Sequence, residues 1–305
     1  MGEGSASAAA PRGGDGCGPR AIPGNAAPAP DARPATEILA QNRRVSTPFM
    51  VAKTQRIADK AWDKFYKAHE DRFFKDRHWT DREFDELAAV ADALSGAPVL
   101  LEVGCGVGNT VYPLLEKNRA LRVHCCDFSP RAIDLVKKHP QYTSDRVHAF
   151  VYDLVQGRDR GEMARALAEC SAWPPVSTLS LIFVMSAIPP DDQLPVLRAL
   201  VQVLPTGATV VFRDYARADL AQLRFHTRKD AQWSEPSLLS DSHDWYRRGD
   251  DTMAYFFTRD EVQRLFDAVG GLEGEVEEVV KTRTNRRTGA VMERRFIQAR
   301  LRRTA

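Results

Sequence analysis

The sequence predicts an α/β fold with a doubly wound, mostly parallel sheet of the Rossmann-like type, and three strand ends support this prediction. An apolar run at 99–103, too short for a helix, ends in three closely spaced glycines: Gly104, Gly106 and Gly108. Glycine is needed where the backbone turns sharply and lies against a ligand without a Cβ in the way. Two later apolar runs end in Asp127 and Asp153. A glycine loop alone also fits any tight strand-to-helix turn, but the three ends in order predict a ligand site along one edge of the sheet.

Seven strands are expected in this sheet. Five apolar runs follow one another with helical segments between them: 99–103, 121–127, 147–152, 179–187 and 210–215. Ser129 and Pro130 begin the helix after the second run, because serine caps helix N-termini and proline fits the first turn. Two further runs, 276–280 and 291–301, flank a basic turn and predict a final hairpin.

The chain of 305 residues is long enough for one domain of about 200 to 250 residues with extensions. Residues 1–50 are expected to form a disordered extension, because residues 1–36 are rich in glycine, alanine and proline without a periodic apolar pattern. No apolar stretch approaches the roughly 20 residues that span a bilayer, so no membrane contact is expected. The extension lacks the apolar core of a secretory signal. This favours a cytoplasmic location, with a nuclear or organellar one left open.

No metal site is expected. The cysteines show no Cys-x-x-Cys spacing and no histidine pair nearby, so they are expected to be small core residues. A zinc site at His124, Cys125 and Cys126 is the alternative. It is disfavoured because neighbouring residues on a strand point to opposite faces.

The net charge is only +2, yet basic residues gather near the C-terminus. Nine lie between Lys281 and Arg303, against one acid, Glu293. Two interpretations remain open at this point. The residues either protect an edge strand from pairing or form a contact surface for a polyanion such as nucleic acid.

Residues 51–97 are expected to form a helical cap on the main domain at 98–303. Apolar and aromatic residues recur every four positions through 57–66, as on the inner face of an amphipathic helix. Thr80 and Glu83 have the spacing of a capping box, which predicts the start of a second helix.

A long insertion, 215–255, separates the fifth strand from the helix that Thr258 begins. Loops of this length in a compact domain are usually functional, so the insertion is expected to form a lid over the ligand site. Its aromatic residues are candidates for stacking on a substrate or for packing: Phe225, Trp233, Trp245 and Tyr246.

Several residue strings occur in a recognisable order. They are Trp62-x-x-Phe65-Tyr66, Phe-Phe-Lys-Asp-Arg-His-Trp at 73–79, the glycine loop with Glu102, Asp-Phe-Ser-Pro-Arg-Ala-Ile at 127–133, and the strings 181–184, 212–215 and 255–258. Across residues 51–303 this set resembles the eukaryotic tRNA N3-methylcytidine methyltransferases, which are class I S-adenosylmethionine-dependent enzymes. The strings at 73–79 and 127–133 are the specific part, whereas the glycine loop occurs in many families.

The resemblance implies that S-adenosylmethionine binds at the strand ends. The residues that it assigns to the cofactor are Trp62, Tyr66, His78, Thr80, Gly104, Gly106, Asp127, Asp153, Leu154 and Ile182. Asp127 would accept from the ribose hydroxyls, and Asp153 from the adenine amino group. For Trp62 and Tyr66 the alternative is a role in the helix core only.

Asp214, at the end of the fifth strand, is the catalytic candidate, with Arg213 beside it. N3 of neutral cytosine already carries a lone pair, so its attack on the methyl group needs positioning more than a strong base. The hypothesis is that the Asp214 carboxylate accepts from the cytosine amino group and offsets the positive charge that develops on the ring. A salt bridge to Arg213 or a hydrogen bond to a loop amide is the structural alternative for Asp214.

The resemblance also implies a tRNA substrate, methylated at cytidine 32 of the anticodon loop, where unpaired bases can splay out. The basic residues expected to contact RNA are Lys75, Arg77, Arg224, Arg247, Arg287 and Arg294. An aminoacyl-tRNA synthetase or another RNA-binding helper is a further expected partner, and its need stays open. Two other functions remain as alternatives: a small-molecule or protein methyltransferase of the same fold, and a catalytically inactive partner subunit.

Overall fold

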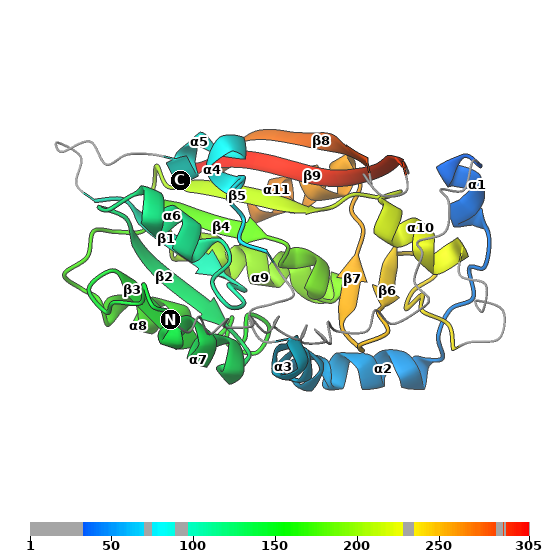
Figure 1. Ribbon diagram of the computed structural model, residues 1–305, viewed down its shortest axis with the longest axis horizontal. Coiled ribbons are helices and arrows are strands. Elements are labelled where there is room, and N and C mark those ends of the chain that lie inside the picture. Colours follow the sequence, from blue (N-terminus) through cyan, green and yellow to red (C-terminus); the bar gives the residue numbers. More distant parts are fainter. Residues whose placement is uncertain are drawn as a thin grey trace, which may run out of the picture.

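A seven-stranded sheet forms the centre of the protein in the computed structural model, which describes residues 33–69, 75–88, 97–227, 235–284, 289 and 291–304. The strand order is β3-β2-β1-β4-β5-β9-β8. The strands are β1 (Val99–Val103), β2 (Arg122–Asp127), β3 (Val147–Val151), β4 (Thr178–Ile182), β5 (Thr209–Tyr215), β8 (Leu272–Thr284) and β9 (Val291–Arg303). The first five are parallel, whereas β9 runs antiparallel to β5 and β8 antiparallel to β9. The predicted doubly wound, mostly parallel sheet with a final hairpin is therefore confirmed (Figure 1).

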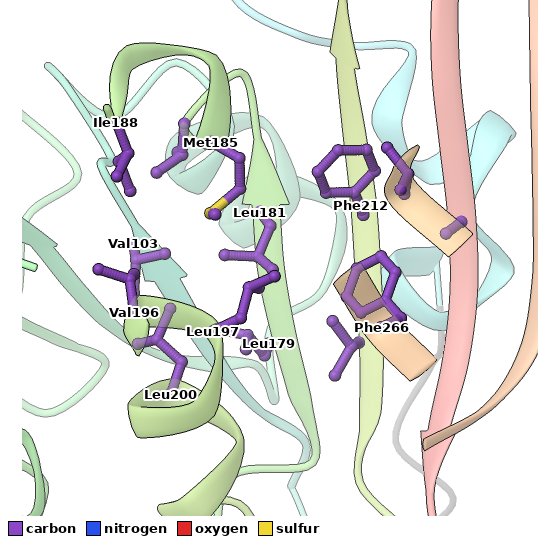
Figure 2. Packing of buried hydrophobic residues seen from close by; sticks show 14 of the residues in the cluster. Val103, Leu179, Leu181, Met185, Ile188, Val196, Leu197, Leu200, Phe212 and Phe266 are labelled. Atoms are coloured by element: carbon purple, nitrogen blue, oxygen red, sulfur yellow. The ribbon is translucent and has the colours of Figure 1, made fainter. Parts of the chain in front are cut away.

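Helices cover both faces of the sheet. They are α6 (Val111–Lys117), α7 (Pro130–Lys138), α8 (Glu162–Ala168), α9 (Pro190–Gln202) and α11 (Arg259–Val269). Residues of α8, α9 and α11 form one apolar core with the strands, and α6 and α7 contribute to a second core on the opposite face. In Figure 2, Leu181 of β4 and Phe212 of β5 lie in the first core, with Leu197 of α9 and Phe266 of α11. Because side chains alternate along a strand, β1, β2, β4 and β5 supply both cores.

Two helix starts follow the sequence expectation. The Ser129 hydroxyl accepts from the Ala132 amide at the start of α7, where Pro130 is the first helical residue. Thr258 and Glu261 form a complete capping box at the start of α11. The expected fourth strand, 179–187, is shorter than predicted, because the chain leaves the sheet after Ile182 and forms the 3-10 helix η1 (Met185–Ala187).

Within the described residues, the cap contains the helices α2 (Pro48–Arg56), α3 (Ala58–His69), α4 (Thr80–Glu83) and α5 (Asp85–Ala88). The capping box expected at Thr80 is wrong. Trp79 is the N-cap residue, and the Thr80 hydroxyl donates to the Arg77 carbonyl. Glu83 instead forms ion pairs with Arg213 and Lys281, two cations of the sheet that compete with the helix amides for its carboxylate.

The segment 33–50 differs from the expected disordered extension. It holds α1 (Ala35–Ala40) and the start of α2. Ile38 and Leu39 are buried, and the Ser46 amide donates to the Leu238 carbonyl across a long sequence separation. This segment is ordered because Ile38 and Leu39 are buried against the rest of the protein. The composition of residues 1–36 gave no indication of such burial. Residues 1–32 lie outside the described residues.

The insertion 215–255 contains a helix and a small hairpin: α10 (Leu220–Thr227), β6 (Trp245–Arg247) and β7 (Met253–Tyr255). It has its own apolar cluster of Leu238, Tyr246, Ala254 and Phe256, on which Phe225 packs. Trp245 and Tyr246 are 4% and 1% exposed, so they pack rather than offer a stacking surface. Trp233 lies outside the described residues. Within the part of the chain that the structure describes, no helix has the length and apolar character to cross a membrane.

Candidate active site

A cavity of about 660 Å³ opens at the carboxyl ends of the parallel strands. Its lining combines residues that follow β1, β2, β3 and β4 with residues of the cap, η1 and the insertion: Ala52, Gln55, Arg56, Ala58, Asp59, Trp62, Tyr66, Gly104, Asp127, Phe128, Tyr152, Asp153, Leu154, Val155, Gln156, Phe183, Val184, Ala187, Ile188, Pro189, Asp192 and Met253. This volume is within the range of cofactor-sized pockets. The position is the one expected for a ligand of an open α/β sheet.

The glycine loop after β1 needs its glycines for two reasons. Gly104 has a φ of +58°, where a side chain strains the backbone. A Cβ at Gly104 would lie 2.8 Å from Val184 Cγ2, and one at Gly106 would lie 3.1 Å from the Tyr66 hydroxyl. The loop can therefore pass close to the cavity wall only without side chains at these positions.

Asp127 joins the glycine loop to the end of β2. Its Oδ2 accepts from the Gly106 amide at 3.0 Å, and its Oδ1 accepts from the Ser129 amide at 3.0 Å. Burial raises the pKa of Asp127 to about 6, while the backbone N–H donors oppose the rise. Each carboxylate oxygen has a second lone pair, so ribose hydroxyls can donate to the same group from the cavity side.

Asp153 follows β3 and lies in a turn that its own side chain stabilises. Its Oδ1 accepts from the amides of Val155 and Gln156 at 2.8 and 3.0 Å, which fixes the carboxylate in the lining of the cavity. Leu154 is part of the same lining. An acid and an apolar residue side by side suit the amino group and the flat face of a purine ring.

The cap supplies an aromatic pair to the opposite side of the cavity. Trp62 stacks on Tyr66 with ring centroids 6.0 Å apart and an angle of 29° between planes. Both residues line the cavity, where a cofactor can contact them, and both also pack in an apolar cluster beneath α3. The two roles that the sequence left as alternatives therefore occur together. Asp63 fixes α3 in place, because its carboxylate accepts from the Ser129 hydroxyl at 2.9 Å and pairs with Arg131.

The comparisons with known proteins agree with this geometry. Residues 101–210 match the family model described as a methyltransferase domain. The tRNA N(3)-methylcytidine methyltransferase trm141 of Schizosaccharomyces pombe is 42% identical over 250 residues, covering 82% of this chain and 94% of the relative. The human tRNA N(3)-cytidine methyltransferase METTL6 is 38% identical over 263 residues, with 86% of each chain covered.

This chain belongs to the tRNA N(3)-cytidine methyltransferase family. A solved SAM-dependent methyltransferase from Anabaena variabilis superposes with a TM-score of 0.55 at 12% identity, covering 80% of this chain and 94% of that chain, and supports the fold alone.

Six of the ten residues expected to bind the cofactor of this methyltransferase line the cavity: Trp62, Tyr66, Gly104, Asp127, Asp153 and Leu154. Gly106 lies just behind them and donates to Asp127. The other three are not part of the lining. His78 is exposed, Thr80 is buried within the cap, and Ile182 is a core residue whose carbonyl accepts from Arg77.

The structure places Asp214 differently from the catalytic hypothesis. The residue is 0% exposed, and its carboxylate accepts from the Ser186 amide at 2.8 Å and the Tyr215 amide at 2.9 Å. Burial raises its pKa to about 6, and the hydrogen bonds from Ser186 and Tyr215 oppose the rise. Because Ser186 belongs to η1, which lines the cavity through Ala187, Asp214 holds the wall and does not face the cavity.

Arg213 is not at the cavity either. Its guanidinium donates to Gln298 Oε1 at 2.9 Å and lies 4.5 Å from the ring centroids of both Trp79 and Phe296. It is 4% exposed. Because a buried cation needs such partners, we assign Arg213 to the interior of the sheet edge.

The basic residues expected to contact RNA occupy different settings. Lys75 and Arg224 are exposed. Arg247 pairs with Asp251 and Arg294 with Asp219, both within hydrogen-bond distance. Arg77 is half-buried and donates to the Thr110 hydroxyl at 3.0 Å. Arg287 lies outside the described residues.

The cavity residues that sequence reasoning missed come from the segment after β4 and from α2. Phe183 and Val184 follow β4, and Ala52 and Gln55 belong to α2, which was partly assigned to the extension. The available signal for α2 was Thr47-Pro48, a helix start with the same chemistry as Ser129-Pro130. No comparable signal marks Phe183, whose φ of +59° is unusual for a bulky residue.

One group of metal-binding side-chain types occurs among the described residues, although no metal site was expected. His124, His148 and Cys170 have donor atoms within 4.8 Å of one another. Burial, with His148 nearby, lowers the pKa of His124 to about 4, and the Nδ1 atoms of the two histidines lie 3.0 Å apart. None of the three lines the cavity, so this group is separate from the methyl-transfer site.

Proposed function

We propose that this protein transfers the methyl group of S-adenosylmethionine to N3 of a cytidine in tRNA, at position 32 of the anticodon loop. The observation that carries the proposal is a cofactor-sized cavity at the strand ends, lined by Gly104, Asp127 and Asp153, in a chain of the tRNA N(3)-cytidine methyltransferase family. Position 32 rests on the resemblance of the sequence motifs.

The residues present fit S-adenosylmethionine. Asp127 can accept from the ribose hydroxyls, and Asp153 with Leu154 can hold the adenine ring. Trp62 and Tyr66 offer aromatic faces to a sulfonium cation, which aromatic rings attract. When bound, the cofactor supplies an activated methyl group.

The chain's own residues then position the acceptor and exclude water. A lone pair is already present on N3 of cytosine, so the site needs no strong base to expose it. Alignment of the two reactants can account for about 7 to 11 kcal/mol of the barrier. The wall formed by η1 and the Phe183 segment is suited to this role, because Asp214 and the Arg213 carbonyl fix its backbone.

The direct test is incubation of the purified protein with labelled cofactor and total tRNA, followed by nucleoside analysis. We expect the label in 3-methylcytidine, and its loss when cytidine 32 of a substrate tRNA is replaced by uridine. Label in another nucleoside would overturn the substrate assignment. Label retained after the replacement would overturn position 32 only.

Contacts between tRNA phosphates and exposed cations such as Lys75 and Arg224 are part of the proposal. They predict binding that weakens steeply with salt, because each phosphate contact releases counterions. Salt-insensitive binding between low and moderate ionic strength would contradict these contacts. Help from an aminoacyl-tRNA synthetase or another RNA-binding protein stays a prediction, which requires activity on total tRNA to rise when the helper is added.

A further inference from the structure

Aromatic rings continue from the cavity along the carboxyl edge of the sheet. Phe183 lines the cavity, and its ring centroid lies 5.0 Å from that of Tyr215 and 5.7 Å from that of Phe296. The ring centroid of Trp79, in the cap, lies 6.5 Å from that of Phe183. We call these four residues the aromatic strip. Trp79, Phe183 and Tyr215 are only half-buried, so a flat ligand can still cover them.

The backbone at Phe183 is built to present this ring. Its φ of +59° is a strained conformation for a bulky side chain. The strain persists because the Phe183 amide donates to the Arg213 carbonyl at 2.8 Å, just beyond the end of β4. This conformation places one ring at the junction of the cavity and the aromatic strip.

Guanidinium groups surround the strip. Arg77 lies 5.3 Å from the ring centroid of Phe183 and Arg248 lies 5.7 Å from that of Tyr215. Arg294 lies 5.4 Å from that of Phe296, and the buried carboxylate of Asp219 holds it at 2.8 Å. Arg77, Arg248 and Arg294 are all half-buried, so these cations lie at the rim of the strip and remain within reach of a ligand.

We propose that the half-buried rings of the aromatic strip, Trp79, Phe183 and Tyr215, are the surface on which the acceptor nucleotide and its neighbour in an unpaired RNA loop stack, with Arg248 and Arg294 facing the phosphates. The inference rests on the proposed function, and it names the surface that binds the acceptor nucleotide. Aromatic faces combined with cations are the chemistry that binds single-stranded nucleic acid. Phe183 brings that surface to the wall of the methyl-donor cavity, where the acceptor base must lie.

The test uses three variants of the full chain, Tyr215→Leu, Tyr215→Phe and Tyr142→Leu. Tyr142 is also half-buried but packs at the edge of the apolar core beyond α7, and it is not part of the cavity lining. Initial rates of methyl transfer to tRNA give KM and kcat, and calorimetry gives the cofactor affinity. We expect Tyr215→Leu to raise the KM for tRNA about 10-fold with cofactor affinity within 2-fold. Tyr215→Phe and Tyr142→Leu should keep the KM.

Stacking has a direct spectroscopic readout as well. An anticodon-loop oligonucleotide with 2-aminopurine next to the acceptor cytidine should lose fluorescence on binding to the unmodified protein and retain it with Tyr215→Leu. An unchanged KM and unchanged quenching in Tyr215→Leu would overturn the proposal. So would an equal loss of cofactor affinity, which would make the ring structural. If the unmodified protein forms no 3-methylcytidine, the proposed function fails instead, and the quenching experiment still decides whether RNA stacks on the strip.

Discussion

The floor and the wall of the cavity are built in different ways. The floor consists of the strand-end residues Gly104, Asp127, Asp153 and Leu154, whose positions follow from the parallel sheet. The wall comes from α2, α3 and η1, which the sheet does not place by itself. It is held by individual polar contacts, such as those that Asp214 makes to Ser186 and Asp63 to Ser129.

Because of this difference, substitutions in the floor and in the wall should affect different properties of the protein. Changes in the floor act on the cofactor directly, because the groups that face it are themselves the strand ends. Changes in the wall act through the placement of a segment, so they should lower cofactor affinity, turnover and thermal stability together. Measurements of cofactor affinity, turnover and thermal stability can therefore distinguish substitutions in the two regions.

The largest effect is expected for Gly104→Val in the floor. A β-branched residue is strained at a φ of +58°, and its Cβ would approach Val184 Cγ2 at 2.8 Å. Strain of this kind costs about 1 to 3 kcal/mol, so with the clash cofactor affinity should fall roughly 100-fold. Calorimetry with S-adenosylmethionine measures it. Gly249→Val is the matched control, because no atom lies within 4 Å of a Cβ there. Equal affinities in the two variants would contradict the close approach of the loop.

Asp214→Asn tests the wall. Its carboxylate accepts two backbone hydrogen bonds in a site with no exposure, and an amide group can accept at only one of its two positions. A hydrogen bond to a charged group contributes about 1.5 to 3 kcal/mol, so we expect roughly 10-fold slower methyl transfer with a lower Tm and weaker cofactor binding.

The outcome for Asp214→Asn also decides between two roles. If turnover falls while Tm and cofactor affinity stay unchanged, the carboxylate contacts the acceptor base in a conformation other than this one. If all three fall together, Asp214 is a positioning residue of η1.

Local sequence patterns predicted the floor well and the wall poorly, for a physical reason, and the family resemblance alone supplied Trp62 and Tyr66 of the wall. Strand ends are marked locally: a buried run and then a glycine or an acid, as at Gly104 and Asp127. Asp214 also ends a strand, yet it faces inward, because the next segment folds back over it and offers the Ser186 amide. Whether a strand-end acid faces ligand or backbone depends on this tertiary contact, which has no local pattern.

The same reason explains the errors in the cap and in the N-terminal extension. Thr80 and Glu83 have capping-box spacing, but Glu83 pairs with Arg213 and Lys281, which are far away in the sequence. Ile38 in α1 is buried within a segment whose composition resembled disorder. Long-range partners decided both outcomes.

A pH dependence is expected from the floor. Burial raises the pKa of Asp127 to about 6, and only its ionised form accepts from ribose hydroxyls with both oxygens. Cofactor affinity should thus fall below pH 6, by up to about 10-fold per pH unit. The stability of the cofactor-free protein has the opposite sign. Because the folded pKa is raised, the contribution of Asp127 is lost as the pH rises from about 4 to about 6.

Calorimetry at pH 5 and pH 7.5 checks this prediction, and two variants assign the titrating group. Asp127→Asn should bind weakly and keep only a small pH dependence, because the Asp214 carboxyl, whose pKa burial also raises to about 6, still titrates behind η1. Asp214→Asn should keep the larger part of the dependence, because this carboxyl does not line the cavity. A flat profile in the unmodified protein would contradict the assignment to Asp127.

The smallest effect is expected for Asp63→Asn, the contact that fixes α3 in the wall. Its Oδ1 accepts from the Ser129 hydroxyl at 2.9 Å. The carboxylate is partly exposed, so water can replace part of the hydrogen bonding that the substitution removes. A hydrogen bond of this kind contributes about 0.5 to 1.5 kcal/mol, which predicts roughly 3-fold weaker cofactor binding. Asp134→Asn, an exposed position on α7, is the control for the change in charge. An unchanged affinity in Asp63→Asn would mean that apolar packing of Phe65 and Tyr66 on Val107 and Ala132 places α3 alone.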